Sequence, residues 1–422
     1  MVNKFLSAGP AASRSAVAVL VMCWIAVVLD GFDLVVLGAL IPTLTGGDSP
    51  WMTPAEATFV STIGLVGMTL GALSIGLATD YLGRRKVMIW SVFGFSLATL
   101  ACGLSSGAGT LALWRFIAGF GLGGCLPTAI AMVNEFSRGQ SGKATTTVMT
   151  GYHVGAVSTA LLALVFLAEY GWASLFFAGA IPGLILAPAM FVWLPESPAF
   201  LLSKGRRAEA EAIAHAYGLT LPEPRAEAPQ ISARELFRAP WLRNSLGIWA
   251  ASFMGLILVY GLNTWLPKLM VSAGYELTGG LWLLLLLNAG AITGLVFAGR
   301  IGDRIGLKNA ALLWFFIGGL LLALLSFRMP PLLLYPAVFI TGCFVFSAQV
   351  LVYAYTAASH PPGVRATALG LSAGIGRVGA IMGPLVGGTL VTWGIAYPWG
   401  FYVFAAVGLC GATAILFWRR LA

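Results

Sequence analysis

The sequence predicts an all-α membrane protein with twelve transmembrane helices in two six-helix bundles. Of its 422 residues, 59% are hydrophobic and only 9% are charged, whereas charged residues make up about 25% of a soluble domain. A helix needs about 20 mostly apolar residues to cross the hydrocarbon of a bilayer. Twelve runs of that kind are present, and one long polar segment divides them six and six.

These runs set the predicted domain boundaries. Polar or Gly/Pro breaks place the helices at approximately 15–43, 56–79, 87–106, 109–136, 143–168 and 172–193, and then at 243–270, 276–300, 309–326, 331–358, 363–392 and 396–418. The bundles are therefore 15–193 and 243–418, with tails at 1–14 and 419–422 and a cytoplasmic central loop at 194–242. We expect the N-terminal tail to be retained, because the first apolar run is too long for a signal-peptide core.

Basic residues indicate the orientation in the membrane. The chain has 24 Lys and Arg residues and a formal net charge of +9, and such residues accumulate on the cytoplasmic side of membrane proteins. With the N-terminus inside, all but Arg115, Lys268, Arg328 and Arg377 fall in or beside the tails, the central loop and the other cytoplasmic loops. Both termini are thus predicted to be cytoplasmic, and the charge gives no reason to expect a nucleic-acid partner.

Several short motifs are better explained by membrane helices than by enzyme chemistry. "GFGLGG" (119–124) matches a dinucleotide-binding pattern and "GLSAG" (370–374) a hydrolase pattern, but both lie within predicted helices and lack the strand that each motif requires. Close helix packing by small residues explains the glycines. No GxxxxGK[ST] loop is present, so an ion gradient is the expected energy source. The five cysteines lack metal-ligand spacing, and no metal or cofactor is expected.

An internal repeat links the two bundles. "GALSIGLATDYLGRRK" (71–86) and "GLVFAGRIGDRIGLKN" (294–309) align at one offset, which pairs Asp80 with Asp303 and Arg85 with Lys308. Each stretch lies between the second and third helices of its half. Because transporters are commonly built from repeated helix bundles, we predict that the halves are parallel repeats of six helices.

These features together resemble the major facilitator superfamily. The loop after the second helix is similar to its signature G-x-x-x-D-x-x-G-R-[RK], which is matched here by Gly76, Asp80, Gly83, Arg84 and Arg85. "DGFD" (30–33), "RFIAGFGLGG" (115–124), "LPESPAFL" (194–201) and "RATALGLSAGIGRVGAIMGPLVGG" (365–388) resemble the aromatic acid:proton symporters. The resemblance implies the major facilitator fold, a multi-pass place in a bacterial-type inner membrane, and protons and a small aromatic carboxylate as ligands.

Charged residues at membrane depth are the candidates for proton coupling. Each costs roughly 2.5 to 3.5 kcal/mol on insertion scales, so pairing or function must offset the cost. Asp30 and Asp33 are three residues apart on one helical face, and crowding two carboxylates makes at least one easier to protonate. We predict that this pair carries the proton, with Asp33 preferred. The alternative is that either aspartate is a permanent partner of Arg115, and Gly31 between them would allow a close approach of a helix or the substrate.

Two further charges near these helices have alternative interpretations. The resemblance associates an arginine at the position of Arg115 with proton transfer. Glu135, near the inner end of the same predicted helix, could release protons or could pair with Arg84 or Arg85.

A substrate site is expected around Arg377, which has no obvious acidic partner at membrane depth in its own half. A guanidinium can bind both oxygens of a carboxylate, although bonding to backbone or to another helix is the alternative. His153 titrates near neutrality when hydrated and could line the site or be a satisfied core histidine. The other expected lining residues are Asp33, Tyr152, Asn263, Trp265, Gln349 and Tyr353, with Tyr260 a further candidate by depth.

An inner gate is expected from the charges of the repeated loops. We predict that these residues form salt bridges that close the cytoplasmic side: Asp80, Arg84, Arg85, Asp303, Arg304 and Lys308. The whole pattern predicts a monomeric, non-enzymatic carrier that imports a benzoate-type or hydroxybenzoate-type acid with protons by alternating access. A symporter of another organic acid, an exporter, a non-transporting receptor and a hydrolase using Ser372 remain alternatives.

Overall fold

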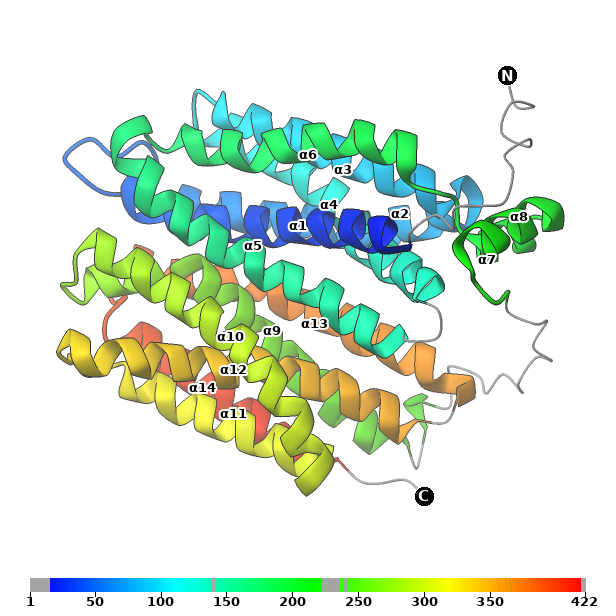
Figure 1. Ribbon diagram of the computed structural model, residues 1–422. Coiled ribbons are helices and arrows are strands. Elements are labelled where there is room, and N and C mark those ends of the chain that lie inside the picture. The colour runs from blue at the N-terminus through cyan, green and yellow to red at the C-terminus, as the bar shows by residue number, and fades with distance from the viewer. Residues whose placement is uncertain (1–15, 138–140, 222–235, 239–240, 361, 419–422) are drawn as a thin grey trace.

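The computed structural model describes residues 16–137, 141–221, 236–238, 241–360 and 362–418. In this part of the chain, twelve helices are long and apolar enough to cross a membrane, as the sequence predicts (Figure 1). The first six are α1 (Ala16–Leu44), α2 (Pro54–Leu82), α3 (Arg84–Gly103), α4 (Ala108–Phe136), α5 (Ser141–Tyr170) and α6 (Ala173–Trp193). The second six are α9 (Trp241–Ser272), α10 (Leu277–Ile305), α11 (Leu307–Leu324), α12 (Pro331–Ser359), α13 (Pro362–Thr392) and α14 (Trp399–Leu416).

Two short helices in the polar segment were not predicted: α7 (Pro198–Ser203) and α8 (Arg207–Tyr217). Local signals explain both of them. The Ser197 hydroxyl accepts a hydrogen bond from the Phe200 amide, and Pro198 occupies the first turn, where its missing N–H costs nothing. Helix α8 buries Ala210, Ala214 and Tyr217 and ends at Gly218 in the left-handed conformation.

The two halves repeat the same packing scheme. In the first half α1 packs against α5, α2 against α4 and α3 against α6; in the second half the equivalent pairs α9–α13, α10–α12 and α11–α14 are in contact. Contacts between the halves also come in equivalent pairs. Helix α2 meets α13, its counterpart in the repeat is the contact of α10 with α5, and α1 meets its own equivalent, α9. The predicted six-helix repeat is therefore present in three dimensions.

The repeated loops share a backbone conformation that requires glycine. Gly83 has φ of 92° and Gly306 has φ of 87°, values that other residues rarely adopt. Each glycine ends the second helix of its half and precedes the third. Helices α2 and α10 therefore continue three to five residues beyond their predicted ends, because the charged residues at the surface stay helical and the glycine stops the helix.

The halves touch near the end of the bundle opposite α7 and α8. A Cβ added at Gly38 of α1 would lie 2.0 Å from the Asn263 carbonyl oxygen of α9, and one added at Gly388 of α13 would lie 1.9 Å from the Thr58 hydroxyl of α2. In Figure 1 the two halves are closest at the end with the α1–α2 connection and draw apart toward the end with α7 and α8. Among the described residues, these two contacts join the bundles closely at the end with the α1–α2 connection.

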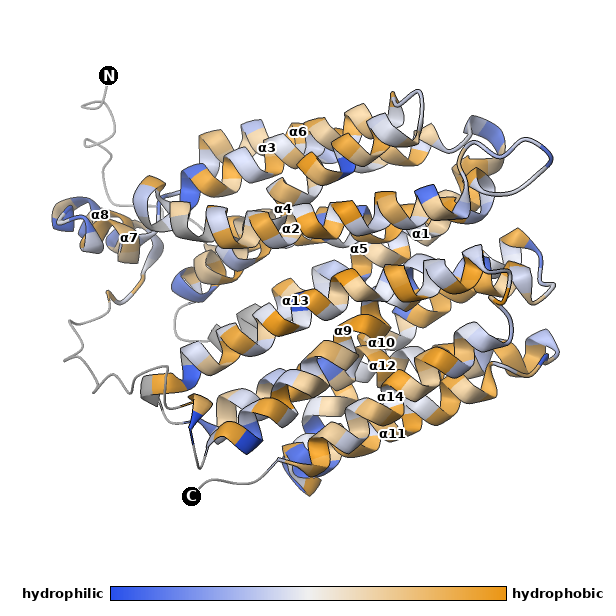
Figure 2. Cartoon of the chain, turned by 180° about the vertical axis from the view of Figure 1, so that it is seen from behind, coloured by the Kyte–Doolittle hydropathy of each residue, from blue (hydrophilic) through white to orange (hydrophobic). Residues whose placement is uncertain are grey.

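The outer surface is apolar along the helices. Leu73, Trp90, Leu113, Ile185 and Phe327 are more than half exposed, and Figure 2 shows hydrophobic residues along both bundles, with hydrophilic ones concentrated in the connections and in α8. Such a belt suits hydrocarbon and not water. Helix α1 begins and α14 ends at the end of the bundle that carries α7 and α8 (Figure 1).

The "GFGLGG" stretch is a helix-packing surface, as predicted. A Cβ on Gly119 would lie 2.0 Å from the Gly64 carbonyl oxygen, and one on Gly123 would lie 2.2 Å from that of Met68. Both contacts bring the backbone of α4 against that of α2. Glycine therefore sets the spacing between these two helices.

We expect Gly119→Ala to lower the unfolding temperature of the purified protein in detergent. The added methyl group has to displace the α2 backbone, and overpacking of this kind costs about 1 to 3 kcal/mol. Gly94→Ala is the matched control, because a Cβ at Gly94 in α3 meets nothing within 4 Å and alanine favours a helix by about 1 kcal/mol over glycine. Equal shifts for both variants would contradict this account of α2–α4 packing.

Candidate functional site

A buried ion pair joins α1 to α4. Arg115 Nη1 donates to Asp33 Oδ2 at 2.7 Å, and Nη2 donates to the Asp33 carbonyl oxygen at 3.1 Å. The Thr99 hydroxyl of α3 donates to the other carboxylate oxygen, Asp33 Oδ1, at 2.8 Å. Asp33 is 2% and Arg115 5% exposed. Both Asp33 oxygens are therefore bonded, which is the arrangement that the sequence offered as the alternative to a proton-carrying Asp33.

Asp30 has a different environment from Asp33. It is 0% exposed, and neither of its carboxylate oxygens has a hydrogen-bond partner among the described residues. Three residues correspond to a rotation of about 60° around a helix, so Asp33 reaches Thr99 of α3 and Arg115 of α4, and Asp30 makes neither of these bonds. Gly31 packs directly on α5, where a Cβ would lie 1.9 Å from the Tyr152 carbonyl oxygen, as expected for a close helix approach.

Arg377 of α13 is the cation that acts on Asp30 from the opposite half. The sequence found no acid for Arg377 because its electrostatic partner lies in the other bundle. Tyr152 of α5 and Tyr260 of α9 interact electrostatically with both Asp30 and Arg377, and Tyr353 of α12 interacts with Tyr260. Arg377 and the three tyrosines are each half-buried. One carboxyl group, one guanidinium and three phenol groups from five helices thus lie within electrostatic range of one another between the halves.

A second polar group crosses between the halves next to these residues. The Asn288 side chain of α10 donates to Asn263 Oδ1 of α9 at 3.0 Å, and it also lies beside the His153 ring of α5. His153 is 8% exposed, and Phe346 of α12 meets it edge-on, with ring centroids 5.6 Å apart. His153 and Asn263 therefore belong to one contact between α5 and the second half.

Two of the expected lining residues bond to other helices of the second half, and their role at the substrate site stays a prediction. Trp265 is 0% exposed, and its indole nitrogen donates to the Pro384 carbonyl at 2.9 Å, between α9 and α13. The Gln349 amide of α12 donates to the Ser252 hydroxyl of α9 at 3.0 Å. Both side chains tie helices of one bundle together.

Glu135 is held at the end of the bundle that carries α7. It forms an ion pair with Arg84, which also donates to the Ser197 hydroxyl at 2.8 Å. Ser197 in turn donates to Glu135 Oε2 at 2.5 Å, and the Ala199 amide donates to the same oxygen at 3.2 Å. The pairing with Arg84 that the sequence offered as an alternative is present, and it anchors α7 to α3 and α4.

Comparison with known proteins identifies this arrangement. The Major Facilitator Superfamily model matches residues 23–376 and 282–422. The chain belongs to this superfamily. It is 33% identical over 418 residues to a benzoate transport protein of Acinetobacter baylyi, covering 94% of this chain and 88% of that one. A gallate transporter of Pseudomonas putida is 31% identical, with 94% and 90% of the two chains covered.

This major facilitator protein therefore groups with the aromatic acid transporters, and it is a transporter rather than an enzyme. Its fold matches that of a solved D-xylose–proton symporter with a TM-score of 0.74, at 15% identity over 96% of this chain and 98% of that one. Twelve membrane-spanning helices and bacterial relatives make it a multi-pass protein of the inner membrane.

In the described structure, Arg85 of the superfamily's signature loop contacts residues of its own half of this transporter. The Arg85 amide donates to Glu196 Oε1 at 3.0 Å, and its guanidinium lies 5.8 Å from the Phe191 ring centroid. Lys308 donates to the Trp418 carbonyl at 2.6 Å. Asp303 and Arg304 are exposed and form no ion pair with another described residue, and the side chain of Asp80 lies outside the described part. A gate between the halves at this end stays a prediction.

Two residues of the transporter's site were missed by the sequence analysis. Thr99 has no sequence signal, because a hydroxyl in an apolar helix commonly bonds its own backbone. Asn288 did have one, since its amide interrupts the run "WLLLLLNAG" (282–290) and is 0% exposed. Buried amides require partners, and this one has Asn263.

We expect Arg115→Gln to destabilise the transporter strongly, because it leaves the Asp33 carboxylate buried without its counter-charge. Breaking a buried pair in this way costs about 3 to 5 kcal/mol. The double variant Asp33→Asn/Arg115→Gln removes both charges and should recover much of that loss. Thermal unfolding of the three proteins in detergent checks this, and a double variant as unstable as the sum of the singles would contradict it.

Proposed function

We propose that this transporter imports an aromatic carboxylate of the benzoate or hydroxybenzoate type together with protons, by alternating access. The carrying observation is the Asp30 carboxyl group, which is fully buried without a hydrogen-bond partner in the described structure and interacts with Arg377 of the other half. The names of the benzoate and gallate transporters support the substrate class.

Substrate binding would centre on Arg377. Its guanidinium offers two parallel donors to a carboxylate, and Tyr152, Tyr260 and Tyr353 provide ring faces and hydroxyl groups around it. Aromatic ligands favour apolar or aromatic walls with a few placed polar groups. His153, with its edge-on contact to Phe346, would border the same space.

Proton coupling would follow from competition for Arg377. An unpaired charge in an apolar interior is costly, and Asp30 avoids that cost either by taking up a proton or by facing the guanidinium. When Asp30 is protonated, Arg377 becomes available to the substrate carboxylate. When the proton leaves, Asp30 attracts Arg377 again and the substrate is displaced.

Asp33 would have a structural role in this scheme. The sequence favoured it as the proton carrier, but its bonds to Arg115 and Thr99 stabilise the charged form of a carboxylate. We therefore assign the proton to Asp30. Arg115 would hold α1 in place, and Glu135 would anchor α7 through Arg84 and Ser197.

Rocking of the two halves would expose the site to each side in turn. We propose that both termini are cytoplasmic, so the end where the halves draw apart faces the cytoplasm. Gly38, Asn263, Thr58 and Gly388 would close the outer side in this state. The charges of the repeated loops, Asp80 to Arg85 and Asp303 to Lys308, would close the inner side in the other.

The decisive experiment is uptake into proteoliposomes under an imposed pH gradient, outside acidic. We expect labelled benzoate or 4-hydroxybenzoate to accumulate and a protonophore to abolish the accumulation. A dicarboxylate is the control for the alternative of another organic acid. Gradient-independent flux, or flux of the dicarboxylate alone, would refute the function.

Ser372 is 0% exposed within α13, which gives the hydrolase alternative no accessible nucleophile.

We expect Asp30→Asn to separate exchange from accumulation. Asparagine mimics the protonated carboxyl group, so labelled substrate should still exchange with unlabelled substrate across the membrane. The pH gradient should no longer drive net accumulation, because no proton is released in the cycle. Counterflow and gradient-driven uptake are measured on the same vesicles, and accumulation equal to that of the parent would remove Asp30 from coupling.

We expect Arg377→Lys to weaken the apparent affinity for the substrate by about ten- to one-hundred-fold. Lysine keeps the charge but loses the planar fork, and one charge-assisted hydrogen bond is worth about 1.5 to 3 kcal/mol. Arg365→Lys is the control, because Arg365 is exposed at the start of the same helix and bonds the His360 carbonyl. The half-saturation concentration of exchange reports the change, and equal values for parent and Arg377→Lys would exclude a bidentate anchor.

A further inference from the structure

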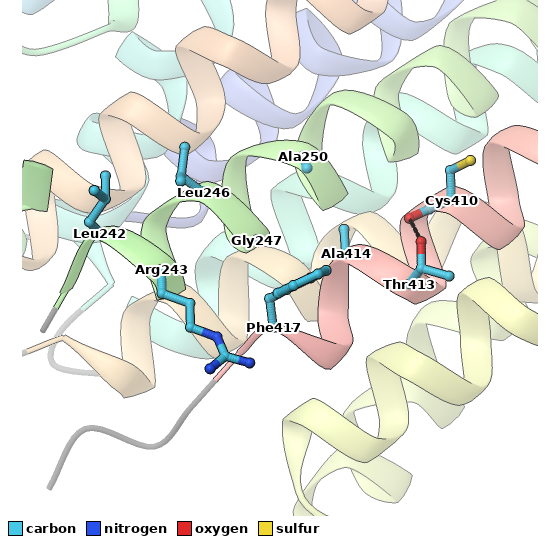
Figure 3. A pocket seen from close by; sticks show the side chains of 9 residues that line it. All are labelled: Leu242, Arg243, Leu246, Gly247, Ala250, Cys410, Thr413, Ala414 and Phe417. Carbon is cyan, nitrogen blue, oxygen red and sulfur yellow. Dashed lines mark hydrogen bonds between the residues drawn. The ribbon is translucent and has the colours of Figure 1, made fainter. Parts of the chain in front are cut away.

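A groove of about 570 Å³ lies on the outer surface of the second half, between α9 and α14 (Figure 3). Leu242, Leu246 and Ala250 line it from α9, and Cys410 and Phe417 line it from the other side. Leu246 and Phe417 are each 53% exposed. The groove is therefore open to the membrane and separate from the site between the halves.

A glycine allows the groove to form. A Cβ on Gly247 would lie 2.8 Å from both the Ala414 carbonyl oxygen and the Trp418 ring, so α9 and the end of α14 meet closely beneath the groove. Trp418 is 0% exposed, and its indole nitrogen has no hydrogen-bond partner within the described chain. The floor of the groove is thus fixed by tight packing.

Arg243 occupies the end of the groove where α9 begins (Figure 3). Its guanidinium lies 5.6 Å from the Phe417 ring centroid, and the structure records no ion pair for it with any described acidic residue. The described lining contains no acidic side chain. An exposed guanidinium at the end of an apolar channel is complementary to an amphiphile with a negative head and an apolar chain.

The length of the groove distinguishes a lipid from a small anion. Cys410 and Phe417 are seven residues apart along α14, which corresponds to roughly 10 Å of helix. One leaflet of the hydrocarbon is about 15 Å thick. The apolar lining therefore extends from the charged end across most of a leaflet, and a free phosphate ion would leave it uncovered.

We propose that this groove binds an anionic phospholipid of the adjacent leaflet, with its phosphate on Arg243 and one acyl chain between α9 and α14. Basic groups between transmembrane helices at a membrane surface are suited to anionic headgroups. The chain places further arginines, Arg419 and Arg420, in the sequence directly after this point. The lipid would bridge the first and last helices of the second half from outside.

Native mass spectrometry of the full chain, released from detergent with equal amounts of phosphatidylglycerol and phosphatidylethanolamine of the same acyl chains, tests the proposal. The parent should retain more phosphatidylglycerol. Arg243→Gln should lower the ratio of the two bound lipids about five-fold, the effect expected of one arginine at a membrane surface. Arg300→Gln, an exposed arginine outside the groove, should leave the ratio unchanged.

A second variant tests the acyl-chain part of the groove separately. Cys410 is exposed, so Cys410→Trp fills the apolar end without entering the core and should reduce retention of both lipids while keeping their ratio. The proposal is overturned if the parent binds the two lipids equally, if Arg243→Gln and Arg300→Gln behave alike, or if Cys410→Trp retains as much lipid as the parent.

Discussion

The cost of a charge in an apolar interior is the constraint on which this structure depends. Arg115 and Asp33 meet that cost together, and three hydrogen bonds from α3 and α4 fix the middle of α1. Once α1 is fixed at Asp33, the position of Asp30 one turn earlier is determined as well. It lies on the part of α1 that faces the other half, where the available cation is Arg377. The Asp33–Arg115 pair thus leaves Asp30 as a buried carboxyl group without a hydrogen-bond partner in the described structure, which is why we propose it as the proton carrier.

Much of the fold could be predicted from the sequence, because a helix that crosses the membrane must be a long apolar run. Twelve apolar runs, the repeated loops and the glycines of "GFGLGG" specify spans, symmetry and close packing through local rules. The predicted ends of α2 and α10 were too early, because the prediction ended each helix where polar residues begin. In the structure each helix continues until the positive φ of Gly83 or Gly306 stops it. Helices α7 and α8 have local capping signals, but the contacts that hold them are distant ones: Glu135 and Arg84 bond Ser197 at the start of α7, and Tyr217 of α8 packs on Phe136 of α4.

For the candidate site, the sequence pointed to the charged residues and left their pairing open, with Arg115 as one possible partner of Asp33. Asp30, Asp33, Arg115 and Arg377 stand out in apolar runs, yet the choice of partner depends on a rotation of about 60° around α1 and on Thr99 in another helix. The surroundings of Trp265 likewise depend on packing between helices, which its depth in the membrane does not specify. Its depth suited a lining residue, but Gly387 opposite leaves space for the indole inside the second half, and the Pro384 carbonyl satisfies its nitrogen. Depth in the membrane follows from sequence, whereas direction around a helix follows from packing.

The equivalence of the contacts between the two halves has a further consequence. Because α2–α13 and α5–α10 are equivalent by the repeat, a rigid rotation of one half can exchange which ends touch while the packing inside each half is preserved. In the proposed alternating-access cycle, the free-energy difference between the two states then resides in the few contacts at the ends, such as Gly388 with Thr58, and not in the residues around Arg377. A population ratio changes ten-fold for about 1.4 kcal/mol. Single substitutions at those ends could therefore reset the resting state of the carrier and leave the intrinsic chemistry of ligand recognition unaltered.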